Sequence, residues 1–144
     1  MCKEYMPIGV RRTQKDRNRK LHTQMTKEEK VYLAKRVNRL NRLVPTNHAL
    51  DKMEILDIPM DYIREILHTV RPDQIVEYNT GRGDEQRVLV KDTRVMTTDT
   101  GKKVNGKYVI DIKTGKLVTV WINGVNDTHK TIDMKLYNKN LKIL

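Results

Sequence analysis

The sequence contains four side chains suited to proton transfer and phosphate binding: His48, Arg82, Arg87 and Lys91. RNA is cleaved without a metal when a base activates the ribose 2′-hydroxyl, an acid protonates the leaving oxygen and cations stabilise the dianionic phosphorane. The histidine can transfer a proton and the other three can supply positive charge, with Tyr78 or His129 as a second proton-transfer group. The set is therefore sufficient for a metal-independent endoribonuclease site, provided that the fold brings its members together.

His48 also has a purely structural interpretation. It is expected near the start of a short helix, where its ring can be hydrogen-bonded beneath a sheet. The residue types leave both interpretations open, so the elements that position His48 must decide between them.

Several enzyme classes are disfavoured because their short motifs are missing. There is no Gly-rich phosphate-binding loop ending in Lys-Ser or Lys-Thr and no nucleophile elbow. One cysteine, Cys2, and four scattered histidines lack the spacing of zinc ligands and permit no internal disulfide. The acidic residues form no compact motif, so a two-metal nuclease would require that folding gather them. We therefore expect no cofactor, no metal and a reducing compartment.

Positive charge is concentrated at the N-terminal end. The 144-residue chain has 29 Lys and Arg against 18 Asp and Glu, a formal net charge of +11. Residues 1–43 carry 13 basic and 4 acidic side chains, or +9. Residues 1–25 have few apolar residues and no sustained period, so we predict a flexible basic arm followed by one domain over residues 26–144. The partner of such an arm is RNA or a nucleoprotein, unless the arm is merely a solvated tail.

Two groups of cations are the predicted nucleic-acid contacts. Those of the arm are Arg11, Arg12, Lys15, Arg17, Arg19 and Lys20. Those of the first predicted helix are Lys35, Arg36, Arg39 and Arg42. Both groups are suited to phosphate oxygens, which would make binding depend strongly on salt.

Three helices are predicted in the first half of the chain. Thr26 and Glu29 have the spacing of a capping box, which predicts a basic amphipathic helix that ends at Pro45. A second helix is expected over residues 46–56 and a third over residues 59–70. The apolar face of the first helix would pack on the core, and its basic face could contact phosphates.

Short β-rich runs follow from Gln74 onward. Residues 75–78 and 87–91 flank one turn, and residues 108–112 and 117–122 flank another, so two hairpins are predicted. Residues 131–137 alternate between polar and apolar and predict a last strand. The fold class is α+β, with N-terminal helices packed on a twisted antiparallel sheet of four to five strands.

One strand shows which face of this sheet is covered. Val118, Val120 and Ile122 alternate along the chain, so they are expected to share the face that meets the helices. Trp121 lies between them and is predicted to be core or half-buried cover rather than a base-stacking surface.

The order of three segments resembles a family of small bacterial and phage proteins. The segments are residues 48–53 (HALDKM), 81–85 (GRGDE) and 114–120 (TGKLVTV). The family looks related to RelE- and BrnT-type toxins and to the barnase, EndoU, colicin and RelE group of metal-independent ribonucleases. The resemblance covers residues 46–123 and implies a RelE-like fold with His48 in a catalytic role. The chain departs from the family pattern near Lys52, where an Arg is frequent, and at residues 56–58, where the family has Arg-Gly-Ile.

Three functions agree with these features. The first is a nucleic-acid- or nucleoprotein-binding protein of phage or mobile-element type on a ribonuclease-like fold, which inhibits a host nucleic-acid enzyme or defence system. The second is a toxin-like, metal-independent endoribonuclease, and the third is a virion structural protein. No apolar run is long enough to span a membrane and no signal peptide is evident, so we expect a cytoplasmic location, in the host cell if the chain is phage-encoded.

Overall fold

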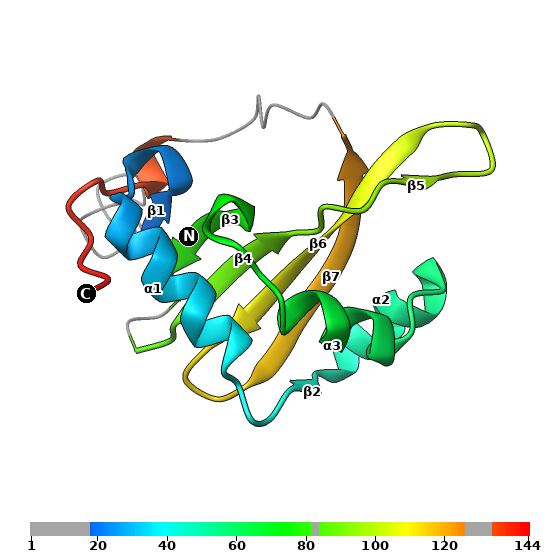
Figure 1. The fold of residues 1–144 in the computed structure, drawn as a ribbon, viewed down its shortest axis with the longest axis horizontal. Coiled ribbons are helices and arrows are strands. Elements are labelled where there is room, and N and C mark those ends of the chain that lie inside the picture. The colour runs from blue at the N-terminus through cyan, green and yellow to red at the C-terminus, as the bar shows by residue number, and fades with distance from the viewer. Residues whose placement is uncertain (1–17, 82–83, 126–133) are drawn as a thin grey trace, which may run out of the picture.

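The computed structural model describes residues 18–81, 84–125 and 134–144, which form a layer of helices on one face of a curved sheet (Figure 1). The α-helices are α1 (Lys27–Asn38), α2 (Asn47–Leu56) and α3 (Met60–Leu67). The strands are β1 (Arg19–Leu21), β2 (Val44–Pro45), β3 (Ile75–Asn79), β4 (Arg87–Lys91), β5 (Met96–Thr97), β6 (Lys103–Asp111) and β7 (Lys116–Gly124). Short 3-10 helices are η3 (His22–Gln24), η4 (Pro72–Gln74) and η5 (Met134–Leu136). The predicted α+β class is confirmed.

The strands follow the order β1-β3-β4-β6-β7-β2 across the sheet, and β5 pairs with β6 off this path. Strand β2 runs parallel to β7, whereas β3 with β4 and β6 with β7 are antiparallel, which confirms the two predicted hairpins. Alternate residues of the central strands face the helices. Those with no exposed surface are Val88, Val90, Tyr108, Ile110, Leu117 and Val120. The hydrophobic core therefore lies between the helices and one face of the sheet.

Helix α1 begins where the capping box predicts. The Glu29 N–H donates to Thr26 Oγ1 (3.1 Å), and the Thr26 N–H donates to Glu29 Oε1 (2.8 Å). The helix ends at Asn38, however, and not at Pro45 as expected. Val44 and Pro45 form β2 instead, because the Val44 N–H donates to the Gly115 carbonyl of the β6–β7 turn (2.9 Å). Pairing with a distant strand thus replaces the last part of the predicted helix.

Helices α2 and α3 confirm the second and third predicted helices. At the start of α2, Thr46 Oγ1 accepts a hydrogen bond from the Ala49 N–H (3.1 Å) and donates to the Val118 carbonyl (2.9 Å). Thr46 therefore both caps the helix and ties it to β7. No helix in the described residues is both long enough and apolar enough to cross a membrane.

Two β-bulges curve the sheet. One interrupts β3, and the other leaves Val118 of β7 without a partner on β6. A bulge adds one residue to one strand, bends it and increases its twist. The expectation that Val118 shares a face with Val120 and Ile122 is therefore wrong: Val120 is buried beneath the helices, whereas Val118 lines a hollow on the opposite face.

The first described element is a strand and not a helix. Strand β1 pairs antiparallel with β3, so residues 18–25 belong to the folded domain, which corrects the arm predicted over residues 1–25. Residues 1–17 lie outside the described residues. The expectation of helices first and of four to five strands is also wrong, since the described part of the sheet has seven strands. Three residues are too few to show a β period in the sequence, and β1 depends on its pairing with β3.

The C-terminal segment lies beside β1. Residues 134–136 form η5, and Tyr137 makes a single parallel bridge with Arg19, so these residues do not form the predicted last strand. Residues 131–133 of that prediction lie outside the described residues. The Tyr137 hydroxyl donates to the Glu77 carboxylate of β3, and burial together with this bond raises the pKa of Tyr137 to about 12.

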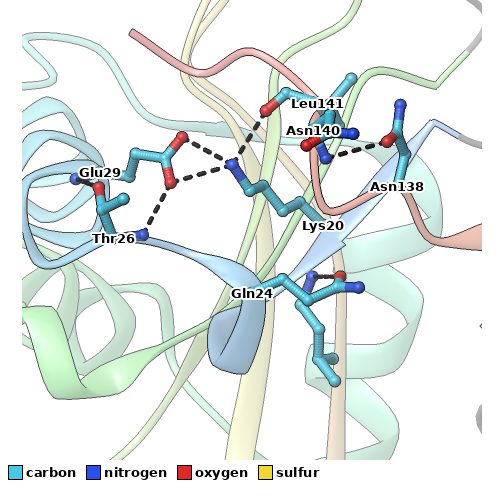
Figure 2. Close-up of polar contacts among 8 residues, drawn as sticks. Lys20, Gln24, Thr26, Glu29, Asn138, Asn140 and Leu141 are labelled. Atoms are coloured by element: carbon cyan, nitrogen blue, oxygen red, sulfur yellow. Dashed lines mark hydrogen bonds and ion pairs between the residues drawn. The ribbon is translucent and has the colours of Figure 1, made fainter.

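Lys20 and Glu29 form a buried ion pair between β1 and α1 (Figure 2). Lys20 Nζ donates to both Glu29 carboxylate oxygens (3.0 and 2.8 Å) and to the Leu141 carbonyl (3.1 Å). Burial acts to raise the pKa of Glu29, but the hydrogen bonds from Lys20 and Thr26 outweigh it and hold that pKa below its ordinary value. The pair therefore joins β1, α1 and the C-terminal segment.

Candidate nucleic-acid interface

The structure does not gather the predicted catalytic residues. His48 is exposed on α2, in the helical layer. Arg87 and Lys91 lie on β4 at positions that alternate with the buried Val88 and Val90, so they face the opposite side of the sheet. Arg82 lies outside the described residues. His48 and Arg87 are thus separated by the sheet itself.

The candidates for a second proton-transfer group, Tyr78 and His129, are not placed beside His48 by the described residues either. Tyr78 is buried beneath the helices, where burial raises the pKa of its hydroxyl, and His129 lies outside the described residues. Among the residues that the structure describes, no group of three or more His, Cys, Asp or Glu side chains could hold a metal ion.

The predicted arm cations divide into two sets. Arg11, Arg12, Lys15 and Arg17 lie outside the described residues. Arg19 and Lys20 lie in β1, where Arg19 Nη1 is 3.7 Å from Glu77 Oε2. Lys20 is only 5% exposed and its ammonium group is fully engaged, so the expectation that it contacts nucleic acid is wrong.

The four cations predicted on the first helix lie at the same end of the molecule as two lysines of the β6–β7 turn. We call this set the basic end: Lys35, Arg36, Arg39, Arg42, Lys113 and Lys116. Arg36 Nη2 donates to the Ile112 carbonyl (3.1 Å), which joins α1 to the turn. Gly115 has a φ of +80°, and a Cβ there would collide with the Arg42 carbonyl, so glycine permits both the turn and the close approach. Figure 1 shows the loop after α1 beside this turn.

The sequence did not predict that the β6–β7 turn contributes to the basic end. Lys113 and Lys116 flank a glycine in a predicted hairpin, so their exposure was readable from the sequence. Their place beside α1 was not, because it depends on the pairing of β2 with β7, and Val44-Pro45 has no strand signal of its own.

The cations of the basic end differ from those near α3 in their partners. Arg64 pairs with Asp61 (3.5 Å), Arg71 with Asp73 (3.2 Å) and Arg94 with Glu65 (2.6 Å). Within the described ranges, no ion pair joins any member of the basic end to a carboxylate. Positive charge therefore accumulates at the basic end and is locally neutralised near α3.

A hollow of about 350 Å³ lies on the face of the sheet opposite the helices. Its lining includes Asn79, Arg87, Thr119, Trp121 and Asn123. Arg87 Nη2 donates to Glu85 Oε2 (2.6 Å), while the buried Arg87 Nε has no hydrogen-bond partner among the described residues. The hollow thus combines one large aromatic surface with polar groups and a guanidinium.

Comparisons of the chain with protein-family models, with curated proteins and with solved structures return no match.

Proposed function

We propose that the protein binds nucleic acid through the basic end, whose cations contact backbone phosphates. The proposal is carried by the gathering of six cations from two segments, with no carboxylate paired to them among the described residues. Like charges held together destabilise a fold unless counterions or a polyanion neutralise them. A nucleic-acid backbone supplies regularly spaced negative charge and releases its own counterions on binding.

Arg36 is the best-positioned member of the basic end. Its Nη1 donates to the Tyr32 hydroxyl (2.6 Å), and its guanidinium carbon lies 5.6 Å from the centre of the Tyr32 ring. A guanidinium held by such contacts loses little conformational entropy when it binds a phosphate.

A nucleoprotein presents the same phosphates. The proposal therefore includes RNA held in a host nucleic-acid enzyme or defence complex, the role expected for a phage or mobile-element protein on a RelE-like ribonuclease fold.

Neutralisation of three cations tests the proposal. In one variant Arg39, Arg42 and Lys113 are replaced by Gln; in a control of equal net charge Arg64, Arg71 and Arg94 are replaced by Gln. Binding of labelled duplex and single-stranded RNA is measured by anisotropy over a range of salt. We expect only the first variant to bind more weakly, with a slope of log K against log salt reduced by about 2 to 3. Equal binding by both variants, or no binding by the wild-type protein at low salt, would contradict the proposal.

Deletion of residues 1–17 tests whether the arm extends the interface. Because residues 18–25 belong to the fold, the deletion must stop at residue 17. Loss of Arg11, Arg12, Lys15 and Arg17 should weaken binding and lower the salt slope further. A slope equal to that of the full chain would mean that these residues are a solvated tail.

The endoribonuclease alternative has its own test. RNA incubated with the protein in excess chelator should remain intact under the binding proposal. Cleavage that leaves 2′,3′-cyclic phosphates, and that His48→Ala abolishes, would favour the enzyme instead.

A further inference from the structure

Trp121 is directed away from the hydrophobic core. Its neighbour Val120 has no exposed surface and faces the helices, so Trp121 faces the other side of β7 and lines the hollow. The cross-strand partner of Trp121 is Lys107 of β6, whose own partner on β4 is Lys91. Of the two predicted placements, core or half-buried cover, the structure shows the second: a half-buried indole beside two cationic strand positions.

Some polar groups of the hollow are used by the fold, such as Glu77, which contacts Arg19 and Tyr137, but others are not. Thr119 and Asn123 lie on either side of Trp121 on the same face of β7, and neither side chain hydrogen-bonds to another described residue. The buried Arg87 Nε also lacks a partner among these residues. A hydroxyl, an amide and a guanidinium can together read the edge of a nucleobase and hold a phosphate.

The hollow begins at the end of the sheet that carries the basic end, where Arg87 pairs with Asp111, and extends along β7 to Asn123. The Ile112 N–H donates to the Gln86 carbonyl (2.8 Å), next to Arg87, and Lys113 Nζ donates to the Asp84 carbonyl (3.3 Å). These bonds join the turn that carries Lys113 and Lys116 to the segment that leads into Arg87. A polynucleotide with phosphates on the basic end can therefore continue around the sheet into the hollow.

The volume and the lining residues of the hollow favour one kind of ligand. A volume of about 350 Å³ is near the lower end for ligand sites and suits one nucleotide. A base in a duplex is stacked on both faces and paired along one edge, so it cannot present a face to an indole within a hollow. A single strand can, and base–aromatic stacking tolerates any sequence.

We propose that this hollow binds an unstacked nucleobase of single-stranded nucleic acid, with Trp121 as its stacking surface and Arg87, Thr119 and Asn123 as its polar contacts. The inference rests on the proposed function, because the basic end supplies the phosphate contacts that deliver the strand. It adds a preference for single strands over duplexes, which the basic end alone does not predict.

The single tryptophan makes the test specific. Because the chain has only one Trp, its fluorescence reports on the hollow alone. Unlabelled single-stranded RNA, single-stranded DNA of the same sequence and duplex RNA are titrated into the full chain, with anisotropy of labelled strands as an independent measure of binding. We expect single strands to quench Trp121 as they bind, and the duplex to bind without quenching. Quenching by RNA alone would add recognition of the ribose 2′-hydroxyl to the site.

Substitution of the indole gives the size of the effect. Trp121→Leu should weaken single-stranded binding about 5- to 100-fold and leave duplex binding unchanged, and Trp121→Tyr should restore most of the loss. Asn123→Asp places a negative charge in the hollow without touching the core, so it should also weaken single-stranded binding selectively. This second variant keeps the test decisive if Trp121→Leu does not fold.

Different results would contradict the base site in the hollow and the phosphate contacts of the basic end. Salt-dependent binding of single strands without quenching, with Asn123→Asp like the wild type, would overturn the base site and leave the basic end standing. An absence of any nucleic-acid binding would overturn both. Quenching that persists when the basic end is neutralised would support the hollow as a separate site.

Discussion

Polar side chains on the two faces of the sheet include some that the fold uses fully and some that it does not use. Beneath the helices, Asp92 has no exposed surface, yet it accepts hydrogen bonds from the hydroxyls of Tyr62 (2.6 Å) and Tyr108 (3.2 Å). On the open face, Thr119 and Asn123 make no side-chain hydrogen bond to any described residue. Buried polar groups must be paired for the chain to fold, whereas polar groups that the fold does not use are available to a ligand. The difference separates structural polar residues from candidate binding residues.

Placing the same charge on each face should give the largest contrast. Val120→Asp puts an unpaired carboxylate into the core and should cost more than about 4 kcal/mol, enough to unfold many small domains. Thr119→Asp puts the carboxylate into the open hollow and should cost less than about 1 kcal/mol. Urea unfolding followed by circular dichroism measures both. A folded Val120→Asp protein would show that the assignment of the two faces is reversed.

The second contrast concerns the buried ion pair on the covered side. Lys20→Met leaves the Glu29 carboxylate buried without its cation and should cost about 3 to 5 kcal/mol at neutral pH. The pKa of Glu29 is held below its ordinary value of 4.5, so its contribution is present above pH 4.5 and is lost as the pH falls through the lower folded value. The difference between wild type and variant should therefore shrink in acid. A difference independent of pH would mean that lost packing, and not the ion pair, is responsible.

The sequence predicted the elements whose signals are local. The α+β class, the capping box at Thr26 and the two hairpins each depend on residues a few positions apart. Strands β1 and β2 were missed because each is only two or three residues long and is held by a partner far along the chain. The bulge at Val118 is also invisible in the sequence, since a single inserted residue leaves the alternation looking regular.

The contrast between local signals and pairing of distant segments also explains which residues of the candidate site were predicted. Lys35, Arg36, Arg39 and Arg42 were predicted because helical spacing places them on an exposed face, although α1 ends at Asn38. Lys113 and Lys116 join them only through the non-local pairing of β2. The proposed catalytic set depended on a shared position for His48 and Arg87, which no local pattern can establish. The sequence left Trp121 open between core and half-buried cover, because its strand alternation does not reveal which face the helices cover.

A smaller effect is expected when one hydroxyl is removed beneath the helices. Tyr62→Phe leaves the buried Asp92 with one donor fewer and should cost about 1 to 3 kcal/mol at pH 7. Burial and the bond to Asp92 raise the pKa of Tyr62 to about 12. Its contribution is therefore complete below pH 10 and is lost as the pH rises toward 12, so wild type and variant should converge there. Urea unfolding at pH 7 and at about pH 11 measures the change. A difference that does not shrink would show that the hydroxyl contributes by packing alone.

The smallest effect on stability is expected when the matching hydroxyl is removed on the open face. Thr119→Val keeps the shape of the side chain and removes one hydroxyl, as Tyr62→Phe does on the covered face. Because the Thr119 hydroxyl has no partner among the described residues, the free energy of unfolding should change by less than about 0.5 kcal/mol. Single-stranded RNA binding should nevertheless weaken, because a nucleobase in the hollow loses one hydrogen bond, and duplex binding should stay the same. If Thr119→Val destabilised the domain as much as Tyr62→Phe, the open face would serve folding as the covered face does. The argument that its unused polar groups mark a binding site would then fail, even if the basic end still bound phosphate.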